Sequence, residues 1–386
     1  MLIFCLALPW WAGAAEPDTI RVGLLHSSTG SMALSEKPLI DAARLAIEEV
    51  NAAGGVLGKK LVAIEADGAS DPQVFAREAE RLITREKVVT IFGCWTSASR
   101  KAVLPVLERH SHLLWYPVQY EGFESSPHVI YTGAAPNQQI LPAVEWCLRH
   151  RGKRMFLVGS DYIFPRTANE IIRQRLKKLG GQTVGEVYRP LGDRDWKQVV
   201  DQIVAARPDV VLNTINGDSN LAFFRELKSR ALAPGKPTVM SFSLAEVELQ
   251  SMGEALPVGH LCAWNYFQSL TYRSNRRFVE TYRRHFGANR VTDDPVEAAY
   301  FGVHLYALAV RKAGSTVIER VRKAAGGLIF EAPSGLVRID PENQHTWKVA
   351  RIGQILPDGQ FQILWTSEQP IRPEPYPDLN RGGFLE

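Results

Sequence analysis

The feature of this chain that most restricts its fold is an alternation of apolar segments and amphipathic helices, which occurs twice. The first series runs from segment 20–25 to segment 113–116, and the second begins after Pro136. Short apolar runs predict buried strands, and apolar positions three and four residues apart predict helices with one covered face. A strand–helix–strand repeat gives parallel strands with helices on both faces. The sequence therefore predicts an α/β fold with two parallel sheets.

Prolines mark two of the expected helix starts. Asp71 followed by Pro72 combines an N-cap residue with proline at the first helical position. Pro38 opens another helix, whose apolar positions continue at Ile40 and Ala43 with helical spacing. We therefore expect a polar turn at residues 26–30 after the first strand and a helix that begins at Pro38.

The first fifteen residues are typical of an export signal. Residues 2–11 are almost wholly apolar, and small residues follow at 12–15. We expect residues 1–15 to be a signal peptide and the mature chain to lie in the periplasm; a buried N-terminal strand is the alternative. The mature chain keeps Cys94, Cys147 and Cys262, and we expect all three to be buried as small apolar side chains.

Composition and motifs make several classes of function improbable. Lys plus Arg number 45 and Asp plus Glu 41, a net charge of +4, which does not predict a nucleic-acid partner. The sequence contains no nucleophile elbow, phosphate-binding loop, dinucleotide-binding motif or zinc-protease motif. We therefore expect a protein that is not an enzyme, with no catalytic residue, no metal site and no cofactor.

Polar turns follow the expected strands of both series. Ligands of parallel α/β sheets bind at the carboxyl ends of the strands. Because turns from both series are polar, one cleft between two lobes is expected. The turns are 26–30, 94–97, 116–119, 160–162, 213–218 and 241–246.

Residues in these turns could hold a small polar ligand. Trp95 and Ser97 lie at a helix start, where free N–H groups and an aromatic face would suit a carboxylate or an amide carbonyl. Ordinary N-capping by Ser97 explains the pattern as well. Asp161 and Glu246 are candidate acceptors, although each could also cap a helix. The candidate ligand-binding residues are Trp95, Thr96, Ser97, Tyr116, Gln119, Asp161, Tyr162, Asn216, Ser243 and Glu246.

Longer motifs surround these turns, and together they resemble one family. Over about residues 20–377 the chain is similar to the urea and short-chain-amide binding proteins, a branch of the type I periplasmic binding proteins. A close sibling of that branch is the cytoplasmic amide sensor that controls amidase expression. The motifs are residues 93–103, 116–124, 135–138, 159–165, 241–246, 263–268, 294–300 and 369–373.

The resemblance implies a division of the chain into two Rossmann-like lobes with a ligand cleft between them. Three crossover strands join the lobes, near Pro136, Tyr266 and Pro341. The implied lobes are 17–136 with 268–340, and 137–267 with 341–386 and the C-terminal tail.

The resemblance also implies how a planar, neutral amide would be held. Ser97 and the helix-start N–H groups would face the carbonyl oxygen, and Asp161 and Glu246 would accept the N–H groups. Buried acceptors reject ligands that leave them unpaired, which favours an amide over a carboxylate. The flat walls of the site would be Trp95, Tyr116 and Tyr162.

The function implied is delivery of urea, or a similar short amide, to the membrane permease of an ABC transporter by cleft closure. A branched-chain amino acid binding protein of the same fold is one alternative, and a cytoplasmic amide sensor is another. The oligomeric state stays open.

Overall fold

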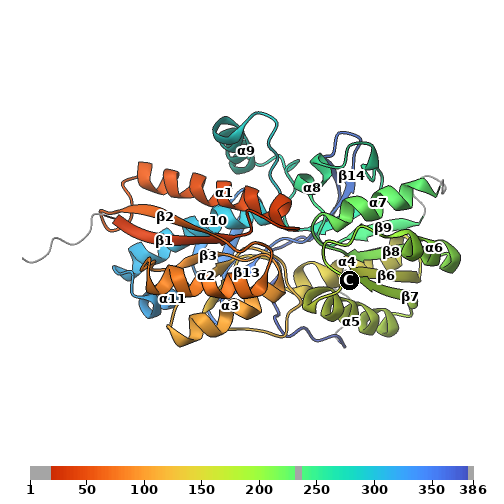
Figure 1. The fold of residues 1–386 in the computed structure, drawn as a ribbon, viewed down its shortest axis with the longest axis horizontal. Helices are drawn as coiled ribbons and strands as arrows, with labels where there is room; N and C mark the ends of the chain where they lie inside the picture. Colours follow the sequence, from red (N-terminus) through yellow and green to blue (C-terminus); the bar gives the residue numbers. More distant parts are fainter. Residues whose placement is uncertain (1–18, 231–236, 381–386) are drawn as a thin grey trace, which may run out of the picture.

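The computed structural model describes residues 19–230 and 237–380, which form two lobes side by side (Figure 1). Each lobe is built on a mainly parallel sheet with helices on both faces. The predicted α/β fold is therefore confirmed. The expected signal peptide, residues 1–15, lies outside the described residues.

The first lobe contains a five-stranded sheet in the order β2-β1-β3-β4-β5, in which every pairing is parallel. Its strands are β1 (Thr19–His26), β2 (Lys60–Asp67), β3 (Ile91–Gly93), β4 (Leu114–Tyr116) and β5 (Val129–Tyr131). The helices α2 (Pro72–Thr84) and α3 (Ser97–Arg109) cover one face. The other face is covered by α1 (Ala33–Ala52), α10 (Asp294–Ala313) and α11 (Ile318–Ala325). The helix α9 (Arg273–Phe286) packs against α1. The short strand β5 was not predicted from the sequence.

The second lobe contains a seven-stranded sheet in the order β15-β14-β10-β9-β8-β6-β7, with the last two strands of the chain antiparallel at one edge. Its strands are β6 (Arg154–Ser160), β7 (Gln182–Arg189), β8 (Val210–Thr214), β9 (Thr238–Ser241), β10 (Leu261–Trp264), β14 (Arg351–Ile355) and β15 (Phe361–Thr366). One face carries α4 (Ile140–His150) and α5 (Ile163–Lys178), and the other carries α6 (Lys197–Ala206) and α7 (Ser219–Ser229). Short helices are α8 (Glu246–Gln250) and the 3₁₀ helices η1 (Pro136–Gln138) and η2 (Gly253–Ala255).

A small antiparallel sheet precedes the last crossing between the lobes. It contains β11 (Ile329–Ala332), β12 (Gly335–Ile339) and β13 (Thr346–Trp347). β13 belongs to this small sheet and β14 to the sheet of the second lobe, because the chain passes from one lobe to the other after β13.

The three crossings are tied together by side-chain amides. Asn265 lies in the second crossing and donates to the carbonyl oxygens of Gln138 in the first and Val349 in the third, both at 3.0 Å. Gln138 also donates to the carbonyl oxygen of Thr346 at 2.9 Å. Movement of the lobes about this junction therefore has to preserve or exchange a small set of buried hydrogen bonds.

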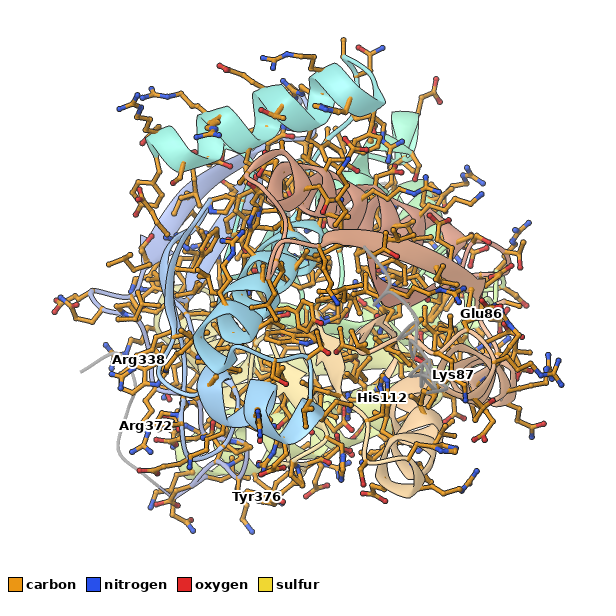
Figure 2. The ribbon with its side chains drawn as sticks, turned by 90° about the vertical axis from the view of Figure 1, so that its left-hand side faces the viewer. Glu86, Lys87, His112, Arg338, Arg372 and Tyr376 are labelled. Carbon is orange, nitrogen blue, oxygen red and sulfur yellow. The ribbon has the colours of Figure 1, made fainter. Side chains whose placement is uncertain are left out.

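The C-terminal segment after β15 runs along both lobes. In the first lobe, the backbone N–H of Phe123 donates to the carbonyl oxygen of Pro375 at 2.7 Å. In the second lobe, Arg175 donates to the carbonyl oxygen of Leu379 at 3.3 Å. Figure 2, viewed from the end of the first lobe, shows Tyr376 of this segment at the outer edge of the molecule.

The first helix begins earlier than predicted, at Ala33 rather than at Pro38. Proline lacks an N–H, so only the bond to the carbonyl oxygen of Leu34 is lost, and the start of a helix tolerates this loss better than its middle. The N–H of Glu36 keeps its bond to the carbonyl oxygen of Met32, at 2.9 Å. This correction places Glu36 on a helix instead of in a loop.

The expected environment of the cysteines is confirmed. Cys94, Cys147 and Cys262 are all buried, and within the described residues none of the three forms a disulfide. Across residues 19–230 and 237–380, every helix is too short or too polar to cross a membrane.

Candidate functional site

The two lobes touch where the carboxyl ends of their strands face each other. Trp95 follows β3, and its Nε1 donates to Oδ1 of Asn216, which follows β8, at 3.4 Å. Gln119 follows β4, and its Nε2 donates to the carbonyl oxygen of Phe242 and to Oγ of Ser243, both at 2.9 Å. All of these residues are buried. The structure thus brings four of the predicted site residues together across the lobe interface.

Two tyrosines predicted as walls of the site lie in the same region. The Tyr116 hydroxyl donates to the carbonyl oxygen of Trp95 at 2.5 Å, and burial raises the pKa of this phenol. Tyr162 comes from the second lobe. Burial raises the pKa of its phenol, and the nearby Tyr116 and Glu121 of the first lobe add to the effect. Tyr162 precedes α5, and α5 contacts α3 of the first lobe.

The hydroxyl of Ser97 is already engaged within the first lobe. It donates to the carboxylate of Glu121 and accepts from Nη1 of Arg100 at 3.1 Å. The guanidinium of Arg100 also contacts Glu121 at 3.2 Å and Glu124 at 2.7 Å. Its charge is therefore neutralised by two buried carboxylates, neither of which the sequence analysis had singled out.

Thr96, rather than Ser97, caps the helix α3. Its Oγ1 accepts from the backbone N–H of Ser99 at 3.0 Å, and its hydroxyl also pairs with the Ser99 hydroxyl. The possible capping role of Ser97 is therefore filled by its neighbour.

The two predicted acceptors, Asp161 and Glu246, lie apart from this group. The Asp161 side chain is 42% exposed and pairs with Nε of Arg166 at 2.6 Å. Glu246 is buried beside the second crossing, where its Oε1 accepts from the backbone N–H of Gln268 at 2.7 Å and its Oε2 has no partner. Burial, with a contribution from the nearby Asp294, raises the pKa of Glu246 to about 8.

A buried His–Glu pair at the end of β1 was missed by the sequence analysis. Glu36 accepts from the backbone N–H of Ser27 at 2.8 Å and lies 3.3 Å from Nδ1 of His26. Both side chains are almost fully buried. The only sequence signal was the polar turn beginning at His26, because Glu36 had been assigned to the loop before the helix.

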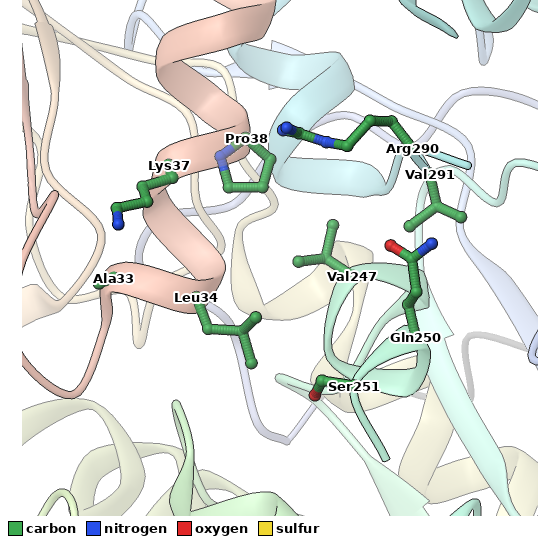
Figure 3. Close-up of a pocket in the computed structure, with 9 residues that line it drawn as sticks. All are labelled: Ala33, Leu34, Lys37, Pro38, Val247, Gln250, Ser251, Arg290 and Val291. Atoms are coloured by element: carbon green, nitrogen blue, oxygen red, sulfur yellow. The ribbon is translucent and has the colours of Figure 1, made fainter. Parts of the chain in front are cut away.

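The rim of the lobe interface carries a pocket of about 370 Å³ between α1 and α8 (Figure 3). Apolar side chains of both lobes line it, and Lys37 and Arg290 add positive charge. Arg290 is paired with Asp41 at 2.6 Å. The lining residues are Ala33, Leu34, Lys37, Pro38, Val247, Gln250, Ser251, Arg290 and Val291. Elsewhere in the described residues, as here, no group of three His, Cys, Asp or Glu side chains is placed to hold a metal ion.

Comparison with known proteins agrees with this two-lobed architecture. Residues 20–381 match the family model described as "Periplasmic binding protein domain". A Leu/Ile/Val-binding protein homolog 7 from Brucella melitensis is 38% identical over 382 residues, covering 92% of this chain and 93% of the relative. A Leu/Ile/Val-binding protein homolog 6 from the same species is 26% identical over 360 residues, covering 89% of this chain and 88% of the relative.

A solved structure has the same fold. It is a solute-binding protein of an ABC transporter from Rhodopseudomonas palustris, in complex with p-hydroxybenzoic acid, with a TM-score of 0.84 and 23% identity. The alignment covers 92% of this chain and 98% of that protein. Members of the matched family bind small solutes, deliver them to ABC permeases and work in the periplasm. The chain therefore belongs to the periplasmic binding proteins, as an ABC transporter solute-binding protein of the Leu/Ile/Val-binding type.

Proposed function

We propose that this protein binds urea, or a similarly small neutral amide, between its lobes and presents it to the permease of an ABC transporter. The lobes would close on the ligand about the three crossings tied by Asn265, the motion typical of periplasmic binding proteins. The urea-type motifs in the sequence support the choice of ligand. The observation that carries this choice of ligand is that the side chains of Ser97 and Arg100 already have partners within the first lobe.

A carboxylate ligand needs a free cation or several free donors. Arg100 is the cation closest in sequence to the Trp95 turn, and Glu121 and Glu124 neutralise it. The Ser97 hydroxyl donates to Glu121 and so has no hydrogen left for a ligand. What remains at the start of α3 is backbone N–H groups, which suit a carbonyl or a carboxylate oxygen. The preference for a neutral amide over an amino acid therefore rests on the neutralised charge of Arg100.

The contacts around the site favour a ligand of few atoms. Trp95 and Asn216 meet directly across the lobes at 3.4 Å, and Gln119 and Ser243 meet at 2.9 Å. With the lobes this close, a flat ligand fits between aromatic rings more readily than a branched aliphatic side chain. Trp95, Tyr116 and Tyr162 supply such rings.

A branched-chain amino acid is the second candidate ligand. The relatives named Leu/Ile/Val-binding protein homologs favour it. Such a ligand would need a partner for its ammonium group and donors for its carboxylate, and Glu36 could serve the first need. The two candidates therefore differ most at the carboxylate end.

Calorimetric titration of the mature chain with urea, acetamide, leucine and p-hydroxybenzoate tests the proposal. We expect heat of binding with urea and a weaker response to acetamide. Leucine and p-hydroxybenzoate are expected to give none. Binding of leucine with no response to either amide would overturn the amide ligand and favour the second candidate.

Export is part of the same proposal, with residues 1–15 as the signal peptide. The mass of the protein recovered from the periplasm tests it, and we expect a chain that begins near Glu16. A protein that keeps residues 1–15 and stays in the cytoplasm would instead support an amide sensor.

A further inference from the structure

Glu36 is a buried carboxylate to which the proposal of an amide ligand has so far given no role. It is 1% exposed and lies in the first turns of α1. The backbone N–H of Ser27 donates to its Oε2 at 2.8 Å, and His26 Nδ1 lies 3.3 Å from the same oxygen. In the described part of the chain, no lysine or arginine lies within ion-pair distance of Glu36. A charge buried in this way is costly unless polar partners compensate it.

The sheet places this carboxylate beside the Trp95 turn. Strands β1 and β3 are neighbours, and the N–H of Cys94 donates to the carbonyl oxygen of Leu25 at 2.9 Å. His26 and Cys94 therefore follow paired positions at the carboxyl end of the sheet. Burial raises the pKa of the Cys94 thiol, and the charge of Glu36 adds to the effect. Glu36 is thus a neighbour of the helix start proposed to hold the ligand carbonyl.

The opposite lobe closes over the same place. A Cβ atom added at Gly217, next to Asn216, would lie 2.8 Å from the carbonyl oxygen of Ser31 and 2.9 Å from Sδ of Met32. These two residues lead directly into the turn of α1 that carries Glu36. Ser35, next to Glu36 in the chain, also contacts the second lobe, because its hydroxyl donates to Oε1 of Glu248 in α8 at 2.6 Å. Glu36 therefore lies at the lobe interface and not in the core of one lobe.

His26, which lies beside Glu36, can also accept a hydrogen bond. If His26 donates from Nδ1 to Glu36, its Nε2 is an acceptor. That Nε2 is buried and has no hydrogen-bond partner within residues 19–230 and 237–380. A ligand rich in N–H groups is the chemical class that such a pair of acceptors suits.

We propose that Glu36 determines specificity by accepting an N–H group of the amide ligand, with His26 and the N–H of Ser27 holding its carboxylate in position. This inference rests on the proposed function. It assigns to Glu36 the acceptor role that the sequence analysis had given to Asp161 and Glu246. The ligand class it selects is planar, neutral and equipped with N–H donors on both sides of a carbonyl, as urea is.

The test is titration of the mature wild-type chain and the Glu36→Gln variant with urea. We expect the variant to bind urea about ten- to a hundredfold more weakly, the loss typical of a charged acceptor facing a buried donor. Asp161→Asn is the matched control, because it also neutralises a carboxylate in a predicted site turn, and it should bind urea like the wild type. Equal urea affinity of wild type and Glu36→Gln overturns the inference.

A second ligand separates recognition from a structural effect. Acetone has the size and carbonyl of urea but no N–H group. Its affinity should therefore be the same for the wild type and for Glu36→Gln. Equal losses for both ligands would mean that Glu36 only supports the fold, which also overturns the inference. If Glu36→Gln does not fold, Glu36→Asp keeps the charge, and we expect it to lose urea affinity while keeping that for acetone. A wild-type chain that does not bind urea at all is a different result, because it overturns the proposed function as well.

Discussion

Two clusters of buried carboxylates lie near the lobe interface, and they are neutralised in opposite ways. In the first lobe, Arg100 holds Glu121 and Glu124 in ion pairs. Burial opposes the charge of Glu124, but Arg100 and Lys101 outweigh it and lower its pKa to about 2. Glu124 therefore stays ionised throughout the physiological range of pH.

The second cluster lies at the crossings and has too few cations. Glu246, Asp293 and Glu297 are buried, and each has one carboxylate oxygen without a hydrogen-bond partner among the residues that the structure describes. The nearby Lys348 is paired with Asp294. Burial raises the pKa of Glu246 to about 8 and, against the opposing charge of Lys348, that of Glu297 to about 7.

The comparison indicates that buried carboxylates respond differently to pH depending on whether a cation lies beside them. A carboxylate beside a guanidinium is kept charged, and removal of the cation is the severe change. A carboxylate without a cation is kept neutral by a proton, and a rise in pH is the severe change. The junction of the lobes is therefore the pH-sensitive part of this molecule.

The largest effect is expected when the first cluster loses its cation. Arg100→Met leaves Glu121 and Glu124 buried and unpaired, which should lower the free energy of unfolding by about 3–5 kcal/mol. Arg100→Lys keeps the charge but loses the forked geometry, so a smaller loss is expected. Unfolding should be measured in guanidinium chloride, because urea is the proposed ligand. A loss below about 1 kcal/mol for Arg100→Met would mean that the cluster contributes little.

The second cluster predicts a loss of thermal stability as pH rises. The pKa of Glu246 is raised from 4.5 to about 8 on folding, so the folded state binds more protons between these values. Its stabilising contribution is complete below pH 4.5 and disappears as pH rises through about 8. We expect the Tm to fall between pH 5 and pH 8, by roughly 2–4 °C for each kcal/mol lost.

Two variants separate the clusters in this experiment. Glu246→Gln should make the decline between pH 5 and pH 8 shallower, with the remaining decline due to Glu297. Glu124→Gln should leave that decline intact, because the pKa of Glu124 is lowered and its contribution is lost only as pH falls from 4.5 through about 2. A Tm of the wild type that is constant from pH 5 to pH 8 would contradict the comparison.

A smaller effect is expected at the contact between the lobes. Gln119→Leu removes two hydrogen bonds to the second lobe, which should destabilise the closed form by about 1–2 kcal/mol and weaken ligand binding by about tenfold. Trp95→Phe removes only the longer bond to Asn216 and should cost less. Titration with urea measures both. Unchanged affinity of Gln119→Leu would show that this contact does not contribute to closure.

The smallest effect is expected at Asp161. Its ion pair with Arg166 is exposed, and exposed pairs change an equilibrium by less than about fivefold. Asp161→Ala should therefore bind urea nearly as well as the wild type. A loss of tenfold or more would place Asp161 in the ligand site after all.

The sequence allowed the layers of the fold to be predicted because each buried strand and amphipathic helix has its own local pattern. The strand β5 and the start of α1 were missed for physical reasons. Val129–Tyr131 is too short to be distinguished from a turn, and Pro38 lies inside α1, where it costs only one N–H bond. The error at Pro38 concealed Glu36, because a residue assigned to a loop has no predictable neighbours.

The sequence predicted which turns form the candidate site, but not which side chains contact one another there. Parallel sheets bring their carboxyl ends together, so Trp95 and Asn216 could be grouped without coordinates. The partners of Ser97 could not be predicted in this way. Glu121 meets Ser97 and Arg100 only once α3 and the loop after β4 pack together. Glu246 was placed correctly at the start of α8, but the direction of its side chain depends on the second crossing.

The threading of the chain between the lobes has a consequence for how the protein folds. Residues of α1 pack against α10, which lies about 250 positions later in the chain. The face of the first sheet that α10 covers therefore stays exposed until most of the chain has been synthesised. Closing a loop of this length costs entropy before any contact compensates for it. We expect the parallel strands β6 to β10 of the second lobe to gain structure before the first lobe is covered by α10, so that a chain truncated before α10 would aggregate through its uncovered sheet.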